Sequence, residues 1–189
     1  LLLDLVYRAI LRMKEGDAEG AATAPSVFIV NLSLGDRNRP FSGPMSPWGR
    51  LLDYLAERFG ILFMVSAGNV TEPLTVRDFA GLIEFEDASP EARETAILRA
   101  LAEQQATRTL LSPAEALNAI TVGAWHEDGA PPANGAAVFS PFATEPGPNI
   151  TSALGLGHRK VVKPDLFMPG GRELVRVVSN GGNGVSLRP

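Results

Sequence analysis

Residues 27–65 have the pattern of a strand, a helix and a second strand, and this order constrains the fold more than any other feature. Residues 27–32 (Val-Phe-Ile-Val-Asn-Leu) form a nearly continuous apolar run, which predicts a strand buried on both faces. Ser46-Pro47 then provides a helix start and Gly60 a helix end, before a second apolar run at 61–65. A unit of this length is a right-handed crossover, so the two strands run parallel in one sheet.

The rest of the chain extends this pattern. Apolar side chains at helical spacing predict helices over residues 1–14 and from Ser89 to about Thr107, with an irregular stretch at 71–88 between the second strand and the latter helix. Residues 119–124 predict a third buried strand, and residues 164–171 a short strand that ends in a rigid turn. Residues 174–178 form a further short apolar run. We therefore expect an α/β fold, a three-layer sandwich with a mainly parallel sheet.

The composition excludes several functional classes. The chain has 45% hydrophobic and 20% charged residues, a net charge of −4, and scattered Lys and Arg, so it predicts neither a nucleic-acid partner nor a polybasic membrane patch. No apolar run approaches the ~20 residues that span a bilayer. Cysteine is absent, which removes disulfides, thiol catalysis and Cys-based zinc sites. Secreted and cytoplasmic locations both stay open.

Two short segments follow the paired strands, and parallel strands place them at one edge of the sheet. Ser33-Leu34-Gly35 follows the first strand, and Ser66-Ala67-Gly68-Asn69 follows the second. Open parallel sheets carry their chemistry at this edge. Asn69 adds a neutral amide donor, which suits a developing oxyanion. The alternative is a turn residue that hydrogen-bonds its own loop.

These residues resemble the subtilisin-like serine peptidases, the subtilases. Four landmarks occur in the family's order, with a helix between the first two. They are residues 30–35 (Val-Asn-Leu-Ser-Leu-Gly), 65–69 (Val-Ser-Ala-Gly-Asn), 112–124 (from Ser-Pro-Ala to Val-Gly-Ala), and 163–165 (Lys-Pro-Asp) with Pro169-Gly170. The resemblance covers roughly residues 1–71 and 110–171. It implies that residues 1–189 are the central part of one catalytic domain, with a helical insertion at about 72–109.

The resemblance also implies roles for the two segments. Asn69 corresponds to the asparagine that stabilises the oxyanion during acyl transfer. Ser33, Leu34 and Gly35 correspond to the extended segment whose backbone pairs with the substrate peptide. Ser66, Ala67 and Gly68 correspond to one wall of the pocket for the residue before the cleaved bond. The expected partner is a peptide or protein substrate, and no cofactor or metal is implied.

The sequence departs from the family in lacking the catalytic Asp, His and Ser. Thr151-Ser152-Ala153 imitates the surroundings of the nucleophile, but it precedes the Pro-Gly turn instead of following it. His126, expected in a solvated turn, and His158, in a Gly-rich loop, lack the family's flanking residues, and Asp165 matches a structural aspartate. We therefore expect a piece of a longer serine endopeptidase, inactive by itself.

We weighed two alternative functions against the peptidase. One is a catalytically dead, subtilase-like binding or regulatory module, whose flanking segments never carried the triad. The other, a nucleotide-binding α/β domain, requires a Gly-rich loop between a strand and a helix, and no such loop is present.

A piece cut from a larger domain also exposes apolar surface and sheet edges, which predicts self-association.

Overall fold

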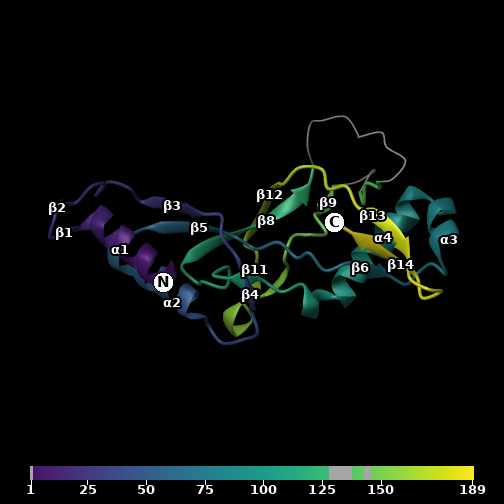
Figure 1. The fold of residues 1–189 in the computed structure, drawn as a ribbon, viewed down its shortest axis with the longest axis horizontal. Coiled ribbons are helices and arrows are strands. Elements are labelled where there is room, and N and C mark those ends of the chain that lie inside the picture. Colours follow the sequence, from purple (N-terminus) through teal and green to yellow (C-terminus); the bar gives the residue numbers. More distant parts are fainter. Residues whose placement is uncertain (1, 128–137, 143–145) are drawn as a thin grey trace. The chain divides into compact units, whose positions relative to one another are not determined.

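A computed structural model describes residues 2–127, 138–142 and 146–189 (Figure 1). The contacts within the chain divide it into two compact units. The first unit comprises Leu1–Gly68, Leu110–Val122 and Leu156–Leu166, and the second comprises Asn69–Thr109, Gly123–Gly155 and Phe167–Pro189.

The first unit contains two long helices and most of the parallel strands. Its elements are α1 (Leu2–Lys14), β1 (Gly16–Asp17), β2 (Gly20–Ala21), β3 (Ile29–Leu32), β4 (Asp36–Pro40), α2 (Pro47–Phe59), β5 (Leu62–Ser66), β7 (Leu111–Ser112), the 3-10 turn η2 (His158–Lys160) and β11 (Val162–Lys163). Three strands have residues in both units: β8 (Ala119–His126), β10 (Gly155–Leu156) and β12 (Leu166–Pro169).

The central sheet has the strand order β12-β8-β5-β3, with β9 (Gly147–Pro148) pairing antiparallel to β8. β3 pairs parallel with β5, with Leu32 opposite Val65, and β5 pairs parallel with β8, with Ser66 opposite Val122. This confirms the predicted crossover and the α/β fold with a mainly parallel sheet. Because β3 and β5 run in register, their carboxyl ends lie at one edge of the sheet.

The prediction that residues 27–32 are buried on both faces is wrong. The side chains of Phe28 and Ile29 are 65% and 47% exposed, and only Val30 and Leu32 pack against the core of the first unit. The reason lies in the strand order, since β3 is the outermost strand of the sheet within the described residues.

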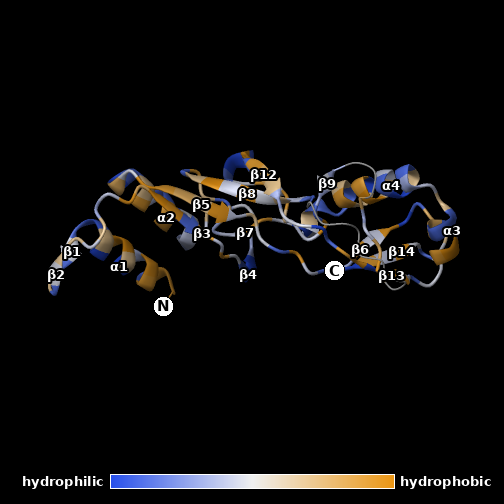
Figure 2. Ribbon diagram, turned by 90° about the horizontal axis from the view of Figure 1, so that it is seen from above, coloured by the Kyte–Doolittle hydropathy of each residue, from blue (hydrophilic) through white to orange (hydrophobic). Residues whose placement is uncertain are grey.

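Helix α2 forms as its sequence predicts and covers one face of the sheet. The Ser46 hydroxyl accepts the Gly49 N–H at 3.0 Å, and Gly60 ends the helix in the left-handed conformation at φ 61°. Leu52 and Leu55 are fully buried in a cluster that also holds Ile10 of α1 and Phe63 and Val65 of β5. Figure 2 shows β5, which belongs to this cluster, in the hydrophobic colour and β4 in the hydrophilic colour.

The second unit has a core of its own. Its elements are β6 (Leu74–Val76), α3 (Leu82–Asp87), α4 (Pro90–Glu103), the 3-10 turn η1 (Gln105–Thr107), β9, β13 (Arg176–Ser179) and β14 (Val185–Arg188). The strands β13-β14-β6 form an antiparallel sheet, and α4 contributes Ile97 and Leu101 to the cluster around Leu74 and Leu187.

The helix predicted from Ser89 is confirmed as α4, and the turn η1 continues it to Thr107. Residues 71–88 are not irregular throughout, because they contain β6 and α3. β6 has only three residues and pairs with β14, far along the chain, so no local pattern marks it. No helix within the described ranges is long and apolar enough to cross a membrane.

Candidate active site

The segment Ser33-Leu34-Gly35 lies exposed between β3 and β4 in the first unit. Of the backbone hydrogen bonds that the described residues form outside helices and strand ladders, none involves these three residues. β4, which follows directly, pairs antiparallel with β7. An exposed stretch with available backbone groups is the kind of edge to which an extended peptide adds as a strand.

The segment Ser66-Ala67-Gly68 is held tightly by its neighbours in the same unit. The Ala67 N–H donates to the carbonyl of Val122 at 2.9 Å, and the Ala67 carbonyl accepts the Leu111 N–H at 3.0 Å. The Ser66 hydroxyl accepts the Gly68 N–H at 3.2 Å. The backbone of this segment is therefore fixed on both sides by residues of the chain itself.

Gly68 is required by the packing at this point. Its φ is +109°, and a Cβ there would lie 2.5 Å from Cγ of Leu111. A Cβ on Gly35 would lie 3.2 Å from Cβ of Leu111 and 3.5 Å from Cα of Gly68. Leu111 thus packs on both glycines, and segments 33–35 and 66–68 lie side by side, as the parallel strands predicted.

A cavity of about 450 Å³ adjoins segment 33–35 in the first unit. Leu34, Trp48 and Pro113 give it apolar walls, and Asp36, Arg37, Asn38 and Ser112 give it polar groups. This mixture of an apolar surface and a few polar side chains is typical of sites that bind side chains or small ligands.

Asn69 is the first residue of the second unit, and its side chain is exposed. Its backbone forms an antiparallel bridge with Ser152, and the next residue, Val70, donates its N–H to the Thr151 carbonyl at 2.8 Å. Within the part of the chain that the structure describes, the Asn69 amide makes no hydrogen bond, so it does not bond its own loop. Its N–H groups can donate to an external oxygen.

Two charged residues that the sequence did not single out hold the strand opposite Asn69. The Glu173 carboxylate accepts the N–H groups of Ile150 at 2.6 Å and Thr151 at 3.4 Å, and burial raises the pKa of this carboxyl. Arg108 donates to the Ile150 carbonyl, and burial lowers the pKa of its guanidinium. Their partners are backbone groups, which nearly every residue has, so the sequence does not predict these contacts.

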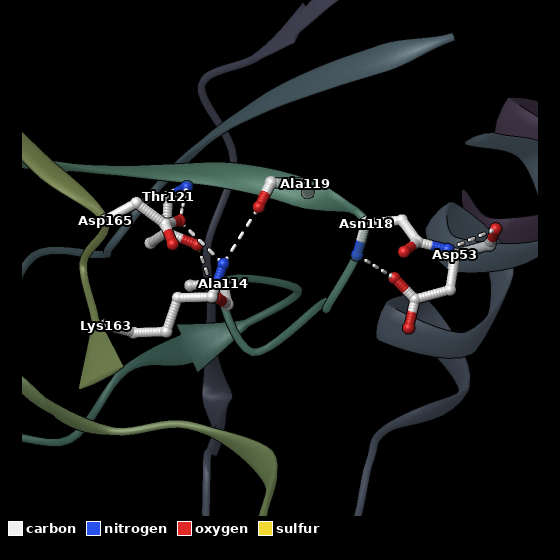
Figure 3. A network of polar contacts seen from close by, with 7 residues as sticks. All are labelled: Asp53, Ala114, Asn118, Ala119, Thr121, Lys163 and Asp165. Carbon is white, nitrogen blue, oxygen red and sulfur yellow. Dashed lines mark hydrogen bonds and ion pairs between the residues drawn. The ribbon is translucent and has the colours of Figure 1, made fainter. Parts of the chain in front are cut away.

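Lys163 and Asp165 form a structural network with β8, shown in Figure 3. The Lys163 side chain is 2% exposed; its ammonium donates to the Ala119 carbonyl at 2.8 Å and pairs with the Asp165 carboxylate at 2.6 Å. The same carboxylate oxygen accepts the Thr121 N–H at 2.6 Å. Because these contacts occupy Asp165, it holds β8 in place, as expected for a structural aspartate.

The prediction of a solvated turn at His126 is wrong, because β8 extends to this residue and buries it to 4% exposure. Its Nδ1 accepts the Glu173 N–H at 3.0 Å, so Nε2 carries the proton and donates to the Ser140 hydroxyl at 3.1 Å. Ser140 in turn donates to the Phe142 carbonyl at 3.3 Å. In this arrangement His126 cannot take a proton from Ser140.

The other candidates for triad residues are also engaged. Ser152 is 3% exposed, and its hydroxyl accepts the Ala124 N–H at 3.0 Å, which agrees with a structural serine. His158 is exposed, with Nδ1 3.2 Å from the Gly43 carbonyl. Residues 2–127, 138–142 and 146–189 contain no group of three or more His, Cys, Asp or Glu side chains that could hold a metal ion.

Comparison with known proteins gives one family. The sequence model of the subtilase family, Peptidase S8, matches residues 7–187. The uncharacterized protein y4bN of Sinorhizobium fredii (strain NBRC 101917 / NGR234) is 32% identical over 148 residues, which are 77% of this chain and 31% of that protein. The chain thus spans about a third of the length of this relative. No solved structure matches the chain.

Proposed function

This chain belongs to the subtilase family, and we propose that the protein is a serine endopeptidase in which Asn69 supplies a side-chain N–H to the oxyanion. Ser33, Leu34 and Gly35 pair with the backbone of the substrate, and Ser66, Ala67 and Gly68 form one wall of the pocket for the residue before the cleaved bond. The observation that carries the proposal is the exposed amide of Asn69, which has no hydrogen-bond partner among the described residues and directly follows a segment that packs beside 33–35.

The chemistry follows from charge development. When a nucleophile attacks the scissile carbonyl, its oxygen becomes negative, and a fixed neutral N–H donor stabilises this charge more than it stabilises the ground-state carbonyl. An amide suits this task because it adds no charge that must itself be solvated. The nucleophile, its base and the acid that orients the base come, in this proposal, from the protein outside residues 1–189.

Kinetics of the full-length protein on a peptide substrate test the oxyanion role. Asn69→Ala should lower kcat by about 10²–10³-fold, the effect that loss of this donor has in subtilisin, itself a subtilase. KM should change by about twofold or less, because the interaction forms mainly in the transition state. Asn183→Ala serves as the matched control, because Asn183 is an exposed asparagine of the same unit as Asn69. A rise in KM with kcat unchanged would contradict the role.

The alternative is a catalytically dead binding module, and the two histidines of the chain agree with both proposals. Neither histidine of the chain is placed as a base beside a serine in the structure, since His126 donates to Ser140 and His158 contacts a backbone carbonyl. A full-length protein that binds peptide but releases no product, with or without Asn69, would favour this alternative over the peptidase.

A further inference from the structure

We propose that Arg108 is a positioning residue for Asn69, and this inference rests on the proposed oxyanion role. Arg108 follows η1, at the end of the segment predicted as an insertion, and belongs to the same unit as Asn69. Its side chain is 1% exposed, and it is the largest of the fully buried side chains. A cation in such a place needs partners that compensate for its lost hydration.

The partners of Arg108 lie on the two strands that form the bridge at Asn69. One end of the guanidinium donates to the Glu72 carbonyl at 3.1 Å, and the other donates to the Ile150 carbonyl. The backbone carbonyl of Arg108 also accepts the Leu154 N–H at 3.0 Å. One side chain therefore links the segment after Asn69 to the segment before Ser152.

The register shows what this link controls. Asn69 is opposite Ser152, and the Val70 N–H donates to the Thr151 carbonyl, so residues 69–72 run antiparallel to 149–152. The two carbonyls held by Arg108 belong to the other end of this short pairing. Two or three residues paired by so few bonds are weakly held by themselves, and Arg108 fixes them at the end opposite Asn69.

Glu173 completes the arrangement from the other side. Its carboxylate accepts the N–H groups of Ile150 and Thr151, while Arg108 holds the Ile150 carbonyl, and the two opposite charges attract. The donor and acceptor groups of Ile150 are thus both engaged by charged side chains. The strand that pairs with Asn69 is fixed before any substrate binds, which is what a preorganised oxyanion donor requires.

Packing alone does not explain why a charged side chain stands at this buried position. Its Nε is buried without a hydrogen-bond partner, so the guanidinium is not fully compensated. Replacing a buried ion pair as a whole by apolar side chains of similar volume is often neutral or stabilising, so filling this space does not by itself require a charge. The planar guanidinium offers donors on two sides, which lets it bridge two carbonyls on separate segments.

A double-mutant cycle in the full-length protein tests the inference. Arg108→Met should lower kcat on a peptide substrate by about tenfold or more, since a misplacement of about 1 Å costs on the order of 10²-fold. KM should stay within about twofold. In the Asn69→Ala background the same substitution should lower kcat by less than about twofold, because the group that Arg108 positions is already gone.

Arg99→Met is the matched control, because Arg99 is an exposed cation on α4 of the same unit and forms an ion pair with Asp78. It should leave kcat unchanged in both backgrounds. Arg108→Lys serves if Arg108→Met does not fold, since it keeps the buried charge but offers a single ammonium instead of two separated donors. It should show the same non-additive loss.

Equal losses of kcat from Arg108→Met, or from Arg108→Lys, in the wild-type and Asn69→Ala backgrounds would overturn the inference and leave the oxyanion role intact. An unchanged kcat in these variants would also overturn it. A different failure, in which Asn69→Ala itself leaves kcat unchanged, would contradict the proposed function and remove the basis of the inference as well.

Discussion

At the scale of single residues, Asn69 and Arg108 of the second unit differ in exposure and in charge. Asn69 is exposed and neutral, whereas Arg108 is buried and charged, and bonds on the paired strands connect the two. The exposed amide could be predicted from its position after an apolar strand. The role of Arg108 could not, because an arginine after a loosely amphipathic helix is usually solvated, and its partners are backbone carbonyls.

Glu173 gives a prediction for the pH dependence of stability. Burial raises the pKa of this carboxyl, although Thr151, Ile150 and Arg108 act in the opposite direction. The unfolded chain ionises at the ordinary value of about 4.3, so the folded state binds the proton more tightly. The contribution of this group to stability is therefore complete below that value and is lost as the pH rises through the raised pKa.

Urea denaturation of the wild type and of Glu173→Gln measures this effect, because the variant cannot titrate at this position. The free energy of unfolding of the wild type, relative to the variant, should fall as the pH rises from about 4 towards neutrality. A relative stability that instead grows over this range would show that the folded state favours the charged carboxylate.

At the scale of elements, local signals decided how much could be predicted. Helices α2 and α4 each begin with a Ser-Pro pair whose hydroxyl caps the first turn, so both were predicted with their starts. β6 and α3 were missed, because β6 exists only through its pairing with the distant β14. The full burial predicted for β3 failed because an apolar run does not reveal whether its strand lies at an edge.

The segment 66–68 gives a prediction at this scale. Gly68→Ala places a Cβ at φ +109° and 2.5 Å from Leu111 Cγ, whereas Gly43→Ala places one at φ +123° with nothing within 4 Å. Backbone strain alone should cost the control about 1 kcal/mol of unfolding free energy. Gly68→Ala should cost about 1–3 kcal/mol more, because Leu111 is crowded. Equal losses in thermal or urea unfolding would contradict the packing role of Leu111.

At the scale of the whole molecule, the family assignment covers residues 7–187, and the proposed catalysis takes its triad from outside residues 1–189. The relative in Sinorhizobium fredii is matched over only 31% of its length. The assignment of residues 1–189 to the centre of one catalytic domain, the insertion at about 72–109 and self-association stay predictions. Arg108, which lies in the predicted insertion, donates to the carbonyls of Glu72 and Ile150 and so connects this segment to the strand beside Asn69.

The most direct measurement is the affinity of the full-length protein and of Asn69→Ala for a peptide aldehyde and for the product peptide of the same sequence. The aldehyde carbon bonds to a serine nucleophile and leaves a tetrahedral oxyanion, whereas the product leaves none. If the Asn69 amide stabilises the oxyanion, the inhibition constant of the aldehyde should be about 10²-fold higher for Asn69→Ala than for the wild type. The affinity for the product should differ by about twofold or less. Equal changes for both ligands, or no change for the aldehyde, would contradict it.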